Sequence, residues 1–174
     1  DTNKVTANDS SFLTTTAFST VGNYYVILEF SHICKIEFFD NAIIQVSNNN
    51  GATWTQLVAT QYLGTGQFGA NGNKFASTSY ADWVPATPSA VPTNSWWKTE
   101  QFDISSLAAN SSQVKVRFKL FDGNGTGAGG NYGWLIDDIN VTMNLSELIP
   151  PVITLLPPNY TATVYSLGPF SVKA

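Results

Sequence analysis

The sequence predicts an all-β fold, an antiparallel two-sheet sandwich of the jelly-roll type. Hydrophobic residues recur with a period of two rather than 3.6, and clusters of Gly, Asn and Ser separate the short hydrophobic runs. Only residues 104–110 have a helical pattern, long enough for a turn or two. Many short strands joined by turns, without a long helix, are typical of antiparallel sandwiches and jelly rolls.

Six strands are expected along the chain. They cover residues 24–30, 34–38, 42–47, 53–59, 114–120 and 134–143. The clearest is 114–120, where Val114, Val116 and Phe118 alternate with Lys and Arg, so that one face is buried and the other is wet. In 34–38 the same alternation places Lys35 and Glu37 on the wet face.

Two segments depart from this pattern. Residues 60–98 are rich in Gly, Ser, Thr and Pro, with aromatic residues interspersed. They are expected to form long loops packed over the sandwich, with room for one short strand. After residue 147 the prolines Pro150 and Pro151 interrupt any strand. The sandwich is therefore placed at residues 1–147. Residues 148–174 are interpreted as a linker and the first strands of an Ig-like domain, or alternatively as a tail docked on the sandwich.

Composition excludes several classes of function. The net charge is −4 with eight Lys and Arg residues, so the chain lacks the excess of basic residues that is typical of nucleic-acid-binding proteins. No apolar run approaches the length of a membrane span, so no membrane insertion is expected. One cysteine and one histidine leave no intramolecular disulfide and no His-based zinc site. The polar but uncharged surface is common in secreted and cell-surface modules, and this localisation is expected here.

The strongest local motif is Ser47-Asn48-Asn49-Asn50-Gly51-Ala52-Thr53-Trp54, which lies between two predicted strands. Asn50-Gly51 suits a hairpin turn, and Ser47 and Asn49 can bond the free turn backbone. Trp54 can fold back over the turn. The motif resembles an Asp-box, with Asn49 where Asp is usual, and we interpret Ser47, Asn49, Gly51 and Trp54 as a structural turn.

A second motif is the strand Trp134-Leu135-Ile136-Asp137-Asp138-Ile139-Asn140-Val141, which carries two adjacent aspartates. Together with Val114–Phe118, the Asp-box hairpin and the Phe102–Leu107 step, it resembles the jelly-roll modules of the MAM-like and cleaved-adhesin type, with a galactose-binding-like sandwich. Similar modules occur in gingipain-type adhesins, immune inhibitor A metallopeptidases and other exported bacterial multidomain proteins. The resemblance covers residues 24–143.

The resemblance implies a structural calcium ion. Calcium requires six to eight oxygen ligands, and Asp137 or Asp138 with Asp40 or Glu37 are the candidates. The alternative is an aspartate pair whose oxygens bond backbone amides at a strand bulge. Residues 122–133 begin like an EF-hand loop, but the twelfth position is Gly133 and no helices flank it, so that reading is rejected.

Aromatic residues of the long loop segment form the candidate ligand site. Tyr80, Trp83, Trp96 and Trp97 could stack on sugar rings, or they could instead roof the core. Catalysis would have to use His32, which lies between two predicted strands. The apolar surroundings of His32 and Cys34 predict a buried histidine and an unreactive thiol. We therefore expect no enzyme but a binding module for carbohydrate or cell-surface glycoprotein, in contact with neighbouring domains of its own chain. The alternative is a spacer that supports a neighbouring catalytic domain, a peptidase or glycosidase.

Overall fold

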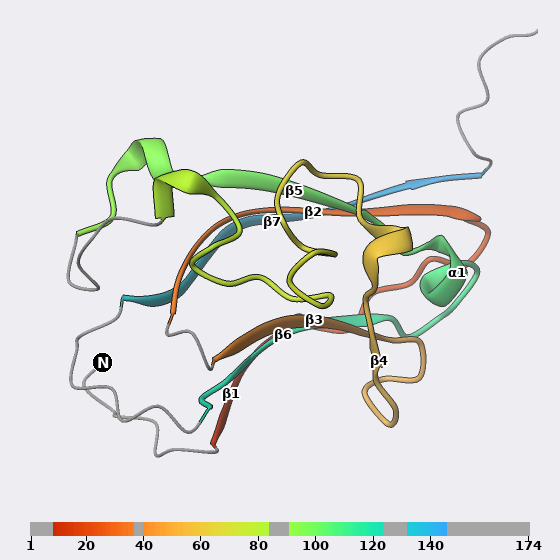
Figure 1. Cartoon of the computed structure of the whole chain (residues 1–174). Coiled ribbons are helices and arrows are strands. Elements are labelled where there is room, and N and C mark those ends of the chain that lie inside the picture. Colours follow the sequence, from red (N-terminus) through yellow and green to blue (C-terminus); the bar gives the residue numbers. More distant parts are fainter. Residues whose placement is uncertain (1–8, 37–39, 84–90, 124–131, 146–174) are drawn as a thin grey trace, which may run out of the picture.

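The protein is a β-sandwich of two antiparallel sheets (Figure 1). The computed structural model describes residues 9–36, 40–83, 91–123 and 132–145. In order across the first sheet lie β1 (Ser10–Thr14), β6 (Lys115–Phe121), β3 (Asn41–Ser47) and β4 (Thr55–Gln56). Across the second lie β5 (Lys98–Asp103), β2 (Tyr25–Lys35) and β7 (Gly133–Asn144). The predicted all-β, two-sheet sandwich is confirmed.

Helical structure is limited to single turns among the described residues. The helix expected within 104–110 is α1 (Ser105–Ala108), and η1 (Ala59–Gln61), η2 (Ala81–Trp83) and η3 (Asn94–Trp96) are 3-10 turns. The Asp103 carboxylate accepts a hydrogen bond from the Ser105 amide, which fixes the start of α1. No described helix has the length and apolar character needed to cross a membrane.

The observed strands differ from expectation in four places. The strand expected at 53–59 is only the two-residue β4, and Ala59 begins η1. The two strands expected at 24–30 and 34–38 are one strand, β2, which runs through His32 without a break. Lys35 is buried rather than wet, because the alternation of burial along β2 ends after His32. Strands β1 and β5 were not among the six expected, although β5 begins at the last residue of the segment where one short strand was allowed.

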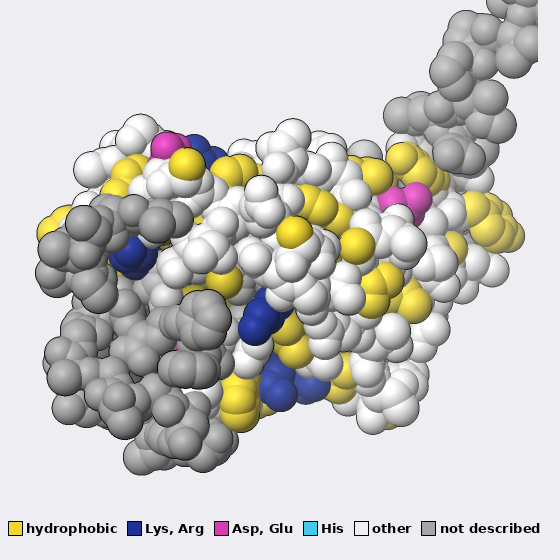
Figure 2. Space-filling view, viewed as in Figure 1, with side chains coloured by type: hydrophobic (Ala, Val, Ile, Leu, Met, Phe, Trp, Pro, Cys, Tyr) yellow, Lys and Arg dark blue, Asp and Glu magenta, His cyan; other side chains and the backbone are white. Residues whose placement is uncertain are grey.

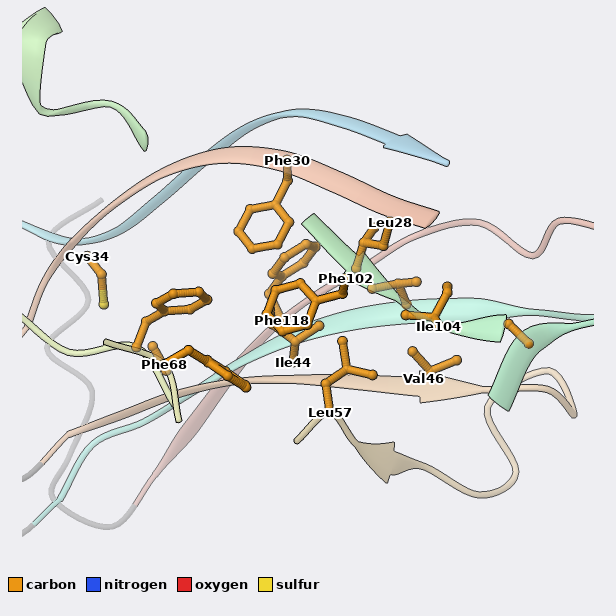
Figure 3. Packing of buried hydrophobic residues seen from close by; sticks show 14 of the residues in the cluster. Leu28, Phe30, Cys34, Ile44, Val46, Leu57, Phe68, Phe102, Ile104 and Phe118 are labelled. Atoms are coloured by element: carbon orange, nitrogen blue, oxygen red, sulfur yellow. The ribbon is translucent and has the colours of Figure 1, made fainter. Parts of the chain in front are cut away.

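The core lies between the inner faces of both sheets (Figure 3). The ring of Phe30 in β2 packs edge-on against Phe118 of β6 at 4.9 Å and stacks on Phe102 of β5 at 6.2 Å. Ile44 and Val46 of β3, in the same sheet as Phe118, face the sheet that carries Phe30 and Phe102. The alternation seen in the sequence thus places one apolar row from each strand in the interior.

The chain between β4 and β5 closes one side of the sandwich. It crosses from one sheet to the other in Figure 1, and it pairs with both: Phe75 bridges Ala42 of β3, and Tyr62 bridges Phe102 of β5. Phe68 and Phe75 are fully buried. The long aromatic segment is therefore a side wall of the core, in agreement with the alternative in which its rings cover the interior.

Some predictions fall outside the described residues. These are the whole of 148–174, with its proposed linker and Ig-like strands, and most of the Gly-rich run that follows Asp122. Glu37 also lies there. The boundary at residue 147 stays a prediction.

Candidate functional site

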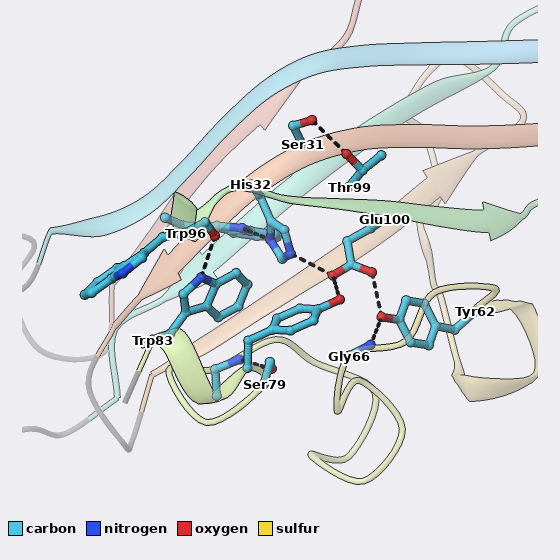
Figure 4. Close-up of polar contacts among 12 residues, drawn as sticks. Ser31, His32, Tyr62, Gly66, Ser79, Trp83, Trp96, Thr99 and Glu100 are labelled. Atoms are coloured by element: carbon cyan, nitrogen blue, oxygen red, sulfur yellow. Dashed lines mark hydrogen bonds and ion pairs between the residues drawn. The ribbon is translucent and has the colours of Figure 1, made fainter. Parts of the chain in front are cut away.

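A chain of hydrogen-bonded side chains, buried at its centre and half-buried at its ends, lies between β2, β5, β7 and the side wall (Figure 4). At its centre is Glu100, which points inward from β5 and is fully buried. Its Oε1 lies 3.1 Å from His32 Nε2 and accepts a hydrogen bond from the Tyr80 hydroxyl at 2.7 Å. Its Oε2 accepts one from the Tyr62 hydroxyl at 2.5 Å. Three donors therefore converge on one carboxylate. Their hydrogen bonds offset the free-energy cost of removing the carboxylate from water.

The outer end of the network fixes the protonation of His32. Trp134 Nε1–H lies 2.9 Å from His32 Nδ1, and an indole nitrogen only donates, so Nδ1 is the acceptor. The ring proton is then on Nε2, where it is donated to Glu100. Burial lowers the pKa of His32, against the opposing effect of Glu100. The imidazole is accordingly neutral and oriented at both nitrogens.

The network offers no free reactive group. Burial, with the hydrogen bond to Glu100 next in importance, raises the pKa of Tyr62 and of Tyr80. Burial likewise raises the pKa of the Cys34 thiol, and Lys35 Nζ is bonded to the Trp83 carbonyl at 2.9 Å. No buried side-chain nitrogen or oxygen among the described residues lacks a hydrogen-bond partner. Within the described residues these interior polar groups are therefore held in hydrogen bonds, and His32, Glu100 and Cys34 are fully buried.

The predicted aromatic platform is not a single exposed surface. Trp83 is fully buried, and its indole N–H donates to the Trp96 carbonyl at 2.8 Å. Its assignment to a stacking site is corrected, because a ring without an exposed face cannot contact a sugar. Tyr80, Trp96 and Trp97 are half-buried and pack against the core. This corner mainly covers the interior.

The two aspartates of β7 form a bulge. Glu29 pairs with Asn140 and Ser31 with Asp137, so Asp138 and Ile139 together face the single residue Phe30. Asp138 has φ of +52°, and its amide donates to Asp137 Oδ1 at 2.9 Å. This arrangement matches the backbone-bonded alternative to the calcium site.

The residues expected to bind calcium do not assemble where the structure describes them. Asp40 lies beside the start of β3, in the other sheet, and accepts a hydrogen bond from the Gly123 amide. Within the described ranges no group of three His, Cys, Asp or Glu side chains is placed to hold a metal ion. Glu37, the fourth candidate ligand, lies outside the described residues, so the calcium site stays a prediction.

The Asp-box-like residues close the turn between β3 and β4. Ser47 Oγ donates to Asn49 Oδ1 and accepts from the Gly51 amide, both at 2.8 Å. Asn49 Oδ1 also accepts from the Thr53 amide at 2.9 Å. Gly51 has φ of +91°, and a Cβ atom there would lie 3.2 Å from the Trp54 ring. A side chain at residue 51 would thus meet both a strained backbone and the indole.

A different cluster lies on the outer face of the four-stranded sheet. The register places Phe12 of β1 beside Lys119 of β6, and Gln45 of β3 beside Arg117. The Arg117 guanidinium lies between two rings, 4.1 Å from that of Trp54 and 4.9 Å from that of Phe12. We call this surface the cationic face; its members are Phe12, Trp54, Lys115, Arg117, Lys119 and Phe121.

The cationic face is open and lacks acidic neighbours within its sheet. Phe12 is 53% exposed, and the other five members are half-buried. No Asp or Glu occurs in β1, β3, β4 or β6. Figure 2 views the sandwich from the side and shows basic side chains toward the lower edge, where the four-stranded sheet lies, and others at the left and at the upper edge.

Sequence reasoning recognised only part of this face. The alternation in residues 114–120 predicted that Lys115, Arg117 and Lys119 share one solvent-facing side of a strand. Phe12 was not assigned to a strand, and Trp54 was assigned only to the turn. The available signal was the absence of Asp and Glu from all the strands of one sheet, which requires knowing which strands pair. No protein-family model matches the sequence, and no curated protein matches it.

Proposed function

We propose that this chain is a non-catalytic binding module of a secreted or cell-surface protein, and that its ligand is carbohydrate or a glycoprotein. The observation that carries the proposal is the cationic face, where aromatic rings and polar side chains share the outer side of one sheet. Aromatic rings stack on the C–H faces of sugars, and the amides of Gln45 and Gln56 beside them can bond hydroxyl groups.

The resemblance to MAM-like and cleaved-adhesin modules supports the same class of function. It also supports a jelly-roll connection of the strands and a place beside other domains of an exported protein. The site of binding differs from our sequence-based expectation, which placed it at Tyr80, Trp83, Trp96 and Trp97. The proposal now rests on the opposite side of the sandwich from β5.

A structural spacer is the second candidate, and one observation favours it. The aromatic residues expected to bind sugar are buried or half-buried against the core, as they would be in a domain that only supports its neighbours. The buried network around Glu100 also serves stability without any ligand. This candidate predicts that neither face of the sandwich binds glycans.

A glycan array compares the two candidates. The wild-type protein should bind a subset of glycans, and Phe12→Thr should lose that binding because it removes the most exposed ring of the face. Leu13→Thr is the matched control, since Leu13 is 48% exposed on the same strand but faces the other way, beside Phe118. Thr keeps a high strand propensity in both variants. A blank array with folded wild-type protein would overturn the binding proposal and favour the spacer.

A further inference from the structure

We infer that the ligand of the cationic face is an acidic polysaccharide, one whose sugar units carry carboxylate or sulfate groups. The inference rests on the proposed carbohydrate-binding function and adds the chemical class of the ligand. Its basis is charge: the chain has a net charge of −4 and only eight basic residues, yet three of them, Lys115, Arg117 and Lys119, lie in one row of β6.

These cations are not neutralised by the protein. Among the described residues the ion pairs are His32 with Glu100 and Lys98 with Asp82, so none of the three takes part in one. The strands of the other sheet contain five acidic residues against two lysines: Glu29, Glu100, Asp103, Asp137 and Asp138 against Lys35 and Lys98. Charge is thus divided between the two sheets, and the four-stranded sheet offers the surface complementary to an anion.

Arg117 is placed to bind a carboxylate. Gln45 Oε1 accepts its Nε–H at 2.7 Å, and the guanidinium lies within cation–π distance of the rings of both Trp54 and Phe12. The other N–H groups of Arg117 have no hydrogen-bond partner among the described residues. A guanidinium fixed in this way presents a preformed fork to a planar anion.

The three cations of β6 are regularly spaced, as binding to a repeating polymer requires. Lys115, Arg117 and Lys119 alternate along β6, so their Cα atoms follow one another at intervals of about 6.6 Å. Phe12 lies across from Lys119, with Lys119 Nζ 5.9 Å from its ring. Rings for sugar faces and cations for acidic groups therefore occur side by side along one strand.

Three described acidic residues lie just beyond the ends of the strands of this sheet. Asp9, Asp40 and Asp122 flank the end of the sheet that carries Phe121. Their charge weakens the positive potential at Lys119 more than at Lys115 and Arg117, which are farther along β6. The end near Trp54 should consequently contribute most to binding the anion.

The test uses dextrans that differ only in charge: neutral dextran, carboxymethyl-dextran and dextran sulfate. Binding is measured by calorimetry at low ionic strength and at about 1 M salt, where the Debye length is about 3 Å. The charged dextrans should bind at low salt and be released at high salt, and neutral dextran should bind much more weakly. Lys115→Gln should weaken binding about tenfold, because a hydrogen bond to a charged group is lost.

Lys98→Gln is the control variant, since it removes the same charge from the other sheet and should leave the affinity unchanged. Unchanged melting temperatures establish that each variant is folded. Equal binding of neutral and charged dextran would overturn the acidic ligand and leave the carbohydrate function standing. Binding of none of the dextrans would overturn the inference, and with a blank array the proposed function as well. Tighter binding of single-stranded DNA than of dextran sulfate would assign the face to nucleic acid instead.

Discussion

At the scale of residues, the interior is organised by one carboxylate. Glu100 receives donors from β2 and from two tyrosines of the side wall, and Gly64 and Gly66 lie against the same network. A Cβ atom at Gly64 would come too close to Glu100 Oε2 and to the Tyr62 hydroxyl, and one at Gly66 would lie 2.7 Å from Tyr80. The glycines of this part of the wall are therefore required by close approach to the network.

The stability of the fold should fall as the pH is lowered below about 6.5, the ordinary pKa of histidine. The pKa of His32 is lowered in the folded protein, so between its folded and unfolded values the unfolded chain binds the additional proton. The stabilisation is complete above 6.5 and is lost as the pH falls toward the folded pKa. Melting temperatures at pH 7.5 and 5.5 measure this effect.

His32→Gln provides the comparison for that measurement. The chain has one histidine, so this variant should lose most of the pH dependence between 7.5 and 5.5, even though it is less stable throughout. If the variant does not fold, Trp134→Phe serves instead: it removes the donor to Nδ1 and should shift the pH dependence. A melting temperature of the wild-type protein that does not change over this range would contradict the assignment of a neutral buried His32.

The bulge in β7 makes a second prediction at this scale. Asp138→Val should lower the free energy of unfolding by about 1–2 kcal/mol, because a β-branched residue is strained at φ of +52°. Asp138→Gly should stay within about 1 kcal/mol of the wild type, since glycine accepts this conformation. Denaturant titrations measure both, with Asn140→Val as the control on the same strand.

Melting temperatures measured with calcium and with EDTA test the same pair of aspartates. Because Asp137 and Asp138 belong to the bulge, the melting temperature of the wild type should be the same in calcium and in EDTA. A ligand bound only to the folded state would raise it. A drop in EDTA that Asp137→Asn abolishes would show that the pair holds calcium and would contradict this interpretation.

At the scale of elements, the side wall is part of the core rather than a surface loop. Phe75 is fully buried and contacts Phe30, His32 and Phe68 with ring centroids 6.4, 4.4 and 5.0 Å apart. Phe75→Ala should cost about 3–5 kcal/mol in the free energy of unfolding, as expected for a large aromatic residue removed from a packed interior. Denaturant unfolding gives the value.

Leu63→Ala is the control within the same segment. Leu63 is 51% exposed, and its loss should change the free energy of unfolding by no more than about 0.5 kcal/mol. Equal, small effects at residues 63 and 75 would mean that the wall is not packed as the structure has it. The aromatic content of residues 60–98 would then need another explanation.

At the scale of the whole molecule, hydrophobic periodicity predicted the sandwich but not all of its strands. β1 was missed because it is a short edge strand and both its faces are largely exposed. β2 was divided at His32, and β5 was missed because Glu100 is one of its inward-facing residues. Both polar residues occupy core positions, where a period-two pattern expects apolar ones, and only the three-dimensional network shows why they are there.

Predicting the candidate site from the sequence depends even more on knowing which strands pair. The sequence indicated the wet row Lys115, Arg117 and Lys119, but the rings that complete the cationic face come from residues far away in the chain, Phe12 and Trp54. Conversely, Trp83 was a candidate for sugar stacking as well as for covering the core, and it is a core residue. Local composition does not distinguish an aromatic residue that covers a core from one that faces a ligand.

The most direct test of the central claim is to map the bound ligand onto the two faces of the sandwich. The amide chemical shifts of the isotope-labelled protein are followed during titration with carboxymethyl-dextran oligomers. We expect the changes to concentrate in β1, β3 and β6, around Phe12, Gln45 and Arg117. Changes centred on Trp96, Trp97 and β5, or no changes at saturating ligand, would contradict the assignment of the cationic face as the binding surface.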